Sequence, residues 1–236
     1  MLVFPLLSFS LTPCRNPACA VGNMSLMLSE TQTVESLTMA AADLPGGRFD
    51  FMPDATSFRG SHHLGDVTMR VRVFGTSSAF ATLTTGGPLA AKAAPLPTPP
   101  GELAAADLSA TLGTPPALSL CLERHYALAP DGHGLQMRFG LSNRGGAAVE
   151  VGAWGAAMVF DTMATEGGGQ RTLGDYAANC SMVDPAISGE GGWVSATRMT
   201  GAGGVLLVVP ERGIGVQAHR EMHETIRYGH TSYGHT

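Results

Sequence analysis

Apolar and polar residues alternate along several stretches of the chain, and this alternation predicts strands. In residues 67–74, VTMRVRVF, every second residue is apolar, which is typical of a strand with one buried face. The same period occurs in residues 117–128 and 135–141, on either side of Asp131-Gly132. We therefore predict an antiparallel hairpin with its turn at that dipeptide. Further strands are predicted for residues 147–160, 192–199 and 205–209, the last two as a pair, and a short helix within residues 171–182.

Three segments break this pattern. Residues 86–106 hold five prolines, which predicts a long surface loop. Residues 21–45 are expected to be a lead-in, with 26–42 either a short helix or extended. Residues 211–236 are rich in histidine, repeat the sequence YGHT and contain few core-forming residues, so we expect a poorly ordered tail. Short strands with glycine-rich turns predict an all-β, antiparallel sandwich over residues 46–210.

Composition narrows the classes of protein that fit. The 236 residues include 31 glycines and 15 prolines, whereas charged residues make up only 14%, well below the usual share of about 25%. These values exclude a coiled coil. A net charge of −5 gives no electrostatic reason to expect binding to nucleic acid.

The N-terminus has features of a signal peptide. Residues 2–11 form an apolar run, and Ala18-Cys19-Ala20 has the small-x-small form of a cleavage site. We predict a signal peptide over residues 1–20 and secretion; the alternative is a cytoplasmic protein with an N-terminal extension. The run is shorter than the roughly 20 residues of a membrane span, so no transmembrane segment is expected. Cys121 and Cys180 would remain, either as one disulfide or as two free buried thiols.

Seven segments between residues 49 and 211 occur in an order that a known group of proteins shares: FDFMP (49–53), HLGDVTMRVR (63–72), VEVGAWG (149–155), MVF (158–160), NCSMVDP (179–185), GGWV (191–194) and GGVLLVVPE (203–211). In these segments the chain resembles an uncharacterised family of large proteins of fungi and bacteria that look like secreted glycosidases. The family departs from this chain after Phe160, where it has an asparagine pair, and after Pro185, where it has an aromatic residue. The resemblance also ends at Glu211, and the tail takes the place of a second domain.

The resemblance implies a supersandwich of the galactose-mutarotase-like type that precedes an α/α toroid, with this chain as the sandwich alone, a truncated form. The catalytic carboxylates of such proteins lie in the toroid, so the catalytic residues are expected outside this chain. The chain would then support or rim a carbohydrate site, with an apolar face exposed where the toroid docks. Alternatives are a stand-alone carbohydrate-binding module, a sugar epimerase or hydrolase complete in this chain, and a fragment without function.

Three residues are the candidates for substrate binding. Trp193, beside two glycines, lies either in the core or on the surface, where its indole would stack on a sugar ring. Asp184 and Asp161 are expected at the ends of loops, where a carboxylate caps a turn or lines a sugar site. Trp154, within an apolar strand, is expected in the core.

Histidines give no metal site or cofactor. In residues 219–223, HREMH, arginine stands where a zinc protease has glutamate. A sugar epimerase would need a histidine base and a carboxylate. We consider His125 with Glu123 and expect the two side chains on opposite faces of a strand, which would exclude the pair.

Overall fold

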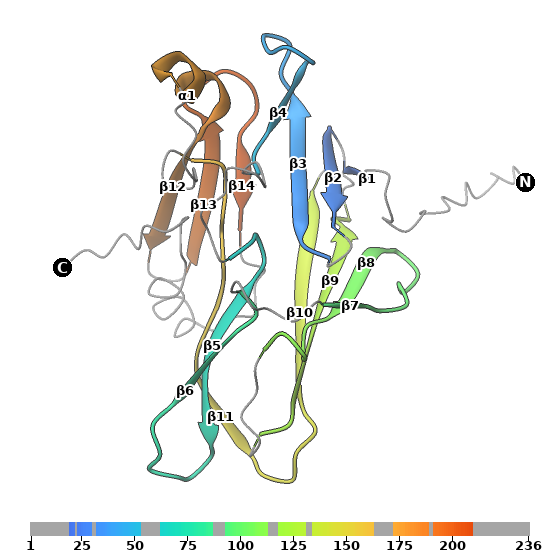
Figure 1. Ribbon diagram of the computed structural model, residues 1–236, viewed down its shortest axis with the longest axis vertical. Coiled ribbons are helices and arrows are strands. Elements are labelled where there is room, and N and C mark those ends of the chain that lie inside the picture. The colour runs from blue at the N-terminus through green and yellow to red at the C-terminus, as the bar shows by residue number, and fades with distance from the viewer. Residues whose placement is uncertain are drawn as a thin grey trace, which may run out of the picture.

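The computed structural model describes residues 19–21, 23–29, 32–52, 62–86, 93–112, 118–130, 134–162, 172–188 and 191–209. Within them, fourteen strands form four antiparallel sheets, in agreement with the predicted all-β class (Figure 1). One sheet has the order β1-β2-β3-β4, formed by Cys19–Val21, Met24–Leu28, Val34–Ala40 and Arg48–Asp50. The second has the order β10-β9-β8-β7, formed by Leu135–Asn143, Leu120–Leu128, Glu102–Asp107 and Ala94–Pro95.

The other two sheets have three strands each. One has the order β11-β5-β6, formed by Val149–Ala156, Val67–Val73 and Ala81–Thr84. The other has the order β12-β13-β14, formed by Ser181–Ser188, Gly191–Arg198 and Leu206–Val208. The helix α1, Leu173–Asn179, leads into β12 and starts with a capping box in which Thr172 and Asp175 bond reciprocally.

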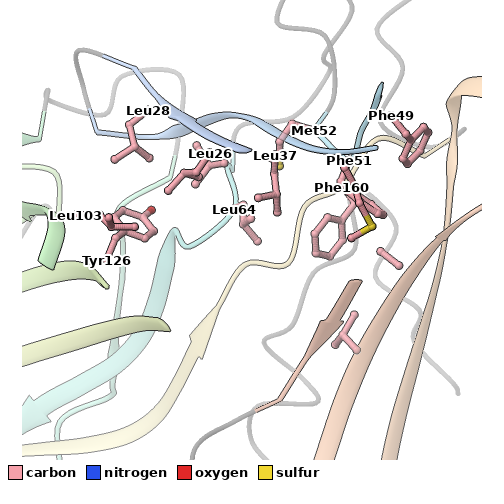
Figure 2. Packing of buried hydrophobic residues seen from close by; sticks show 14 of the residues in the cluster. Leu26, Leu28, Leu37, Phe49, Phe51, Met52, Leu64, Leu103, Tyr126 and Phe160 are labelled. Carbon is pink, nitrogen blue, oxygen red and sulfur yellow. The ribbon is translucent and has the colours of Figure 1, made fainter. Parts of the chain in front are cut away.

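The sheets pack through their apolar faces around two core clusters, and the β7–β10 sheet contributes side chains to both. In the first core cluster, Leu26 and Leu37 of the β1–β4 sheet share buried surroundings with Val194 and Ala196 of β13 (Figure 2 shows the part around Leu26, Phe51 and Tyr126). The second cluster joins β5 and β6 to β8 and β9, with side chains such as Met69 and Leu122. Figure 1 shows the β1–β4 and β12–β14 sheets in the upper half of the molecule, β5, β6 and β11 in the lower half, and β8 and β9 at mid-height. This arrangement is sandwich-like, because sheets pack face to face, with β8 covered on both of its faces.

Most of the predicted elements are present. The strand predicted over 67–74 is β5, and the predicted hairpin is β9–β10, paired from Leu120↔Asn143 to Leu128↔Leu135. The predicted pair at 192–199 and 205–209 is β13–β14, and the helix expected within 171–182 is α1.

Two predictions about secondary structure were incomplete or wrong, one at residues 24–40 and one at residues 86–106. Residues 24–40 form β2 and β3 within the sandwich, because their apolar positions alternate across a bulge at Met27/Leu28. The loop expected over 86–106 ends before residue 102, because Glu102–Asp107 forms β8. Four successive residues of β8 are buried, so the strand shows no alternation of apolar and polar positions. Strands β1, β4, β6, β7 and β12 were also not predicted.

Several predictions concern residues outside the described part, namely the signal peptide, apart from Cys19 and Ala20 in β1, and the tail over 211–236. Cys121 and Cys180 are buried, and no disulfide joins them. No helix in the described ranges is long and apolar enough to cross a membrane. In the same ranges, no group of three or more His, Cys, Asp or Glu side chains could hold a metal ion.

Candidate functional site

The outer face of the β12–β14 sheet carries several exposed large apolar side chains. Cross-strand pairing places Asp184 opposite Ser195, Ala186 opposite Trp193 and Leu207 opposite Ser195, so these positions share one face. The inward positions of β13, Val194 and Ala196, are buried in the first core cluster. We call the outer surface the Trp193 face; its exposed large apolar residues are Met182, Trp193, Met199, Val205, Leu207 and Val209.

The structure brings together two of the three predicted site residues. Trp193 is 42% exposed, and Asp184 lies diagonally across from it on β12, two positions from its direct partner. Asp161 is elsewhere: it is buried, its backbone N–H bonds the carbonyl of Phe51 at 2.7 Å, and its carbonyl accepts from Ser181 at 2.6 Å. Asp161 therefore belongs to the interior and not to an exposed rim. Trp154 is partly buried as expected, packed edge-on to Phe139 at a centroid distance of 5.6 Å.

A row of charged side chains crosses the β8–β9–β10 sheet. The prediction that His125 and Glu123 lie on opposite faces of a strand is wrong, because the two residues form the centre of this row. Residues two apart on a strand share a face, so Glu123 and His125 lie on the same side of β9. The Nε2 atom of His125 is 3.4 Å from Oε2 of Glu123, and its Nδ1 is 2.7 Å from Oε2 of Glu102. Arg138 donates from Nη2 to the other oxygen of Glu102 at 2.7 Å.

Side-chain contacts fix the centre of this charged row. Glu102 is largely buried and bonded to two partners, so its position is fixed, whereas Glu123 is about one-third exposed. His125 lies between the two carboxylates, with one ring nitrogen near each of them. The signal that would have found this group is the spacing E-x-H on an alternating strand, together with an acidic residue on the neighbouring strand.

A second polar group lies inside the sandwich, on the opposite face of β9. Arg124 is buried and donates to the backbone carbonyls of Gly65, at 3.1 Å, and Gln32. Its guanidinium lies over the ring of Tyr126, at 5.2 Å from the centroid. Alternation had placed Arg124 and Tyr126 in phase with the buried Leu120 and Leu122, which is the sequence signal for their burial.

Asp66 supplies the negative charge near this arginine. The carboxylate accepts from the backbone N–H of His63 at 2.6 Å and from the hydroxyl of Thr85 at 3.0 Å. Burial raises the pKa of Asp66, but the hydrogen bonds from His63 and the charges of His63 and Arg124 outweigh burial and bring the pKa below its usual 3.8. The group therefore stabilises the junction between the turn at Gly65 and β9.

Comparison with known proteins gives a family and no function. No curated protein and no solved structure matched the chain. One family model, described as a family of unknown function (DUF5695), matches residues 26–236. The match includes residues 211–236, so the tail falls within the family's pattern, contrary to the expectation that the resemblance ends at Glu211. The match spans most of the chain, which therefore belongs to this family of unknown function.

Proposed function

We propose that this chain is a non-catalytic β-sandwich domain of a secreted, glycoside hydrolase-like protein, and that its Trp193 face packs against a second, helical domain. The observation that carries the proposal is the exposure of six large apolar side chains on one sheet face. With each about half exposed and roughly 200 Å² in size, they present about 600 Å². That area is at the upper end for the largest apolar patch of a monomer, about 300–600 Å².

The neighbours of Trp193 favour a protein partner over a sugar. A sugar site combines an aromatic ring with side chains that hydrogen-bond the hydroxyl groups. Asp184 and Ser195 are polar positions on the face of Trp193, but the exposed residues in and next to β14 are aliphatic: Val205, Leu207 and Val209. Aromatic and aliphatic side chains at the centre of a patch are typical of the core of a protein interface.

The test uses the helical domain of a longer member of the family, produced separately and titrated with this chain by calorimetry. Trp193→Ala and Leu207→Ser should each weaken binding at least tenfold, because central aromatic and apolar contacts dominate such interfaces. Phe74→Ser is the matched control, since Phe74 is 67% exposed but follows β5, outside the Trp193 face. Absence of binding by the unaltered chain, or an equal loss in the control, would refute the proposal.

The same variants test the alternative of a stand-alone carbohydrate-binding module. In that case the helical domain would not bind, whereas the unaltered chain would bind a glycan and Trp193→Ala would abolish that binding.

The charged row favours a sugar epimerase as a second candidate function. Opening a sugar ring requires a base at the anomeric hydroxyl and an acid at the ring oxygen, and Glu123 with His125 supplies both kinds of group at 3.4 Å. Under this hypothesis the chain accelerates the mutarotation of an aldose, followed by polarimetry, and His125→Asn abolishes the acceleration. Equal rates with and without the protein would eliminate this candidate.

A further inference from the structure

The outer face of the β11–β5–β6 sheet differs from the Trp193 face because it is polar. Along β5, Val67, Met69 and Val71 are fully buried, so Thr68, Arg70 and Arg72 point outward. Pairing with β6 sets Thr82 opposite Arg70 and Thr84 opposite Thr68. Two rows of hydrogen-bonding side chains thus lie next to each other on adjacent strands.

Arg70 is an exposed cation whose charge is not neutralised. Its one contact among the described residues is with the ring of Phe80, 5.2 Å from the centroid, and it has no carboxylate partner there. The neighbouring Arg72 is different, because Glu150 accepts from its Nε at 2.7 Å and from its Nη2 at 3.0 Å. Arg70 therefore keeps its N–H donors available on a face where the adjacent charge is already paired.

Phe80 holds the arginine in place. The ring lies against the backbone of Gly152, where a Cβ atom would come within 2.6 Å of Cε1 of Phe80. Arg72 packs over the same ring at 4.3 Å. A guanidinium that is already supported by an aromatic ring loses less freedom when it binds a ligand.

Hydroxyl groups continue the surface away from Arg70. The hydroxyl of Thr82, directly opposite Arg70, is exposed and has no hydrogen-bond partner among the described residues. The hydroxyl of Thr68 donates to Thr84 at 3.2 Å, and Thr84 lies 3.3 Å from Nε2 of His62. We call Arg70, Thr82, Thr68, Thr84 and His62 the Arg70 strip.

We propose that the Arg70 strip binds an acidic sugar, with the guanidinium of Arg70 pairing a carboxylate and the threonine hydroxyls bonding the sugar hydroxyls. A guanidinium matches the two oxygens of a carboxylate in a planar, two-bond arrangement. One unpaired arginine supplies one positive charge, which suits the single charge of a carboxylate. The site lies on a different sheet from the Trp193 face, so it stands or falls independently of the docking proposed there.

The experiment measures binding of the full chain to polygalacturonate, with its fully methyl-esterified form as the uncharged counterpart. The acid polymer should bind and the ester should not, and added salt should weaken the binding because the key contact is a charge pair. Arg70→Gln should reduce affinity at least tenfold, as expected for the loss of charge-assisted hydrogen bonds. Thr82→Val, which keeps the shape and removes the hydroxyl, should give a smaller loss.

Arg48→Gln is the matched control, because Arg48 is also exposed, lies on β4 of another sheet and donates to Thr38. It removes the same charge and should leave affinity unchanged. If galacturonic acid monomer displaces the polymer, one acidic sugar unit is enough for binding. If the monomer does not displace the polymer, the Arg70 strip binds several units at once. Both outcomes support the proposal. It is overturned if the acid polymer does not bind, if the ester binds equally well, or if the two arginine variants behave alike.

Discussion

Removal of the hydroxyl group of Tyr126 should stabilise the protein. The side chain is 1% exposed, and its hydroxyl has no hydrogen-bond partner among the described residues. An unpaired polar group in the interior costs about 1–3 kcal/mol of stability. Tyr126→Phe removes this group but keeps the ring, its packing near Leu103 (Figure 2) and its contact with Arg124. After a small penalty for the space left by one oxygen, we expect a gain on the order of 1 kcal/mol in the free energy of unfolding.

Alkaline pH should enlarge the difference in unfolding free energy between Tyr126→Phe and the unaltered protein. Burial raises the pKa of Tyr126 above its usual 10.0; the charge of Arg124 opposes this effect and that of Asp66 adds to it. The folded protein therefore keeps the phenol protonated at a pH where the unfolded chain releases the proton. The unaltered protein therefore keeps its full stability below pH 10, the pKa of the unfolded chain, and loses stability as the pH rises from there toward the higher folded-state pKa. For one group, the loss approaches about 1.4 kcal/mol per pH unit, and the phenylalanine variant lacks it.

The assay is urea unfolding of both proteins, followed by tryptophan fluorescence, near pH 7 and again near pH 11. Tyr176→Phe is the control: that tyrosine is half-buried on α1, so the variant should keep the alkaline loss caused by Tyr126. A phenylalanine variant that is less stable at pH 7 would mean that the hydroxyl is bonded in the protein. An equal difference between the two proteins at both pH values would mean that the phenol is not buried.

Three further substitutions test other contacts. Burial raises the pKa of Asp66, but hydrogen bonds and a nearby guanidinium outweigh burial and hold this pKa below 3.8. The ionised carboxylate therefore contributes stability above pH 3.8, and this contribution is lost as the pH falls through the lower folded-state pKa. Asp66→Asn should remove this acid-dependent loss of stability, which acid titration followed by ellipticity measures. Gly152→Ala should lower the unfolding free energy by about 1–3 kcal/mol, because its Cβ would lie 2.6 Å from the ring of Phe80, whereas Gly146→Ala, with open space around it, should not. Arg198→Lys should destabilise by about 1 kcal/mol or more in urea unfolding, because the buried guanidinium bonds both a carboxylate of the β3–β4 turn and a carbonyl of α1.

The sequence predicts best those strands that have one buried and one solvated face. β5 is the clearest case, since its inward valines and methionine are fully buried and its outward residues are polar. β8 could not be found in this way, because Leu103 to Ala106 are all buried and a strand covered on both faces has no alternation. β2 and β3 were obscured for a different reason: a bulge shifts the register between them and interrupts the period of two.

The charged row could have been predicted in part. Two-residue spacing alone places Glu123 and His125 on one face, and the hairpin register then brings Arg138 directly opposite His125. Glu102 could not be added from sequence, because it lies beyond a further bulge, between Glu102 and Ala104, in a stretch assigned to a loop.

In β13 the smaller apolar residues face the core, whereas the largest one faces outward. Its inward positions hold Val194 and Ala196, while its outward positions include the larger Trp193, and the exposed Met199 directly follows the strand. A strand that gives its larger apolar side chains to water forgoes stabilisation of about 1.5–3 kcal/mol for each large side chain left unburied. The arrangement is physically reasonable if both faces of the strand are covered when the protein works. This reversal, and not the presence of tryptophan alone, is why we propose that the Trp193 face packs against a partner.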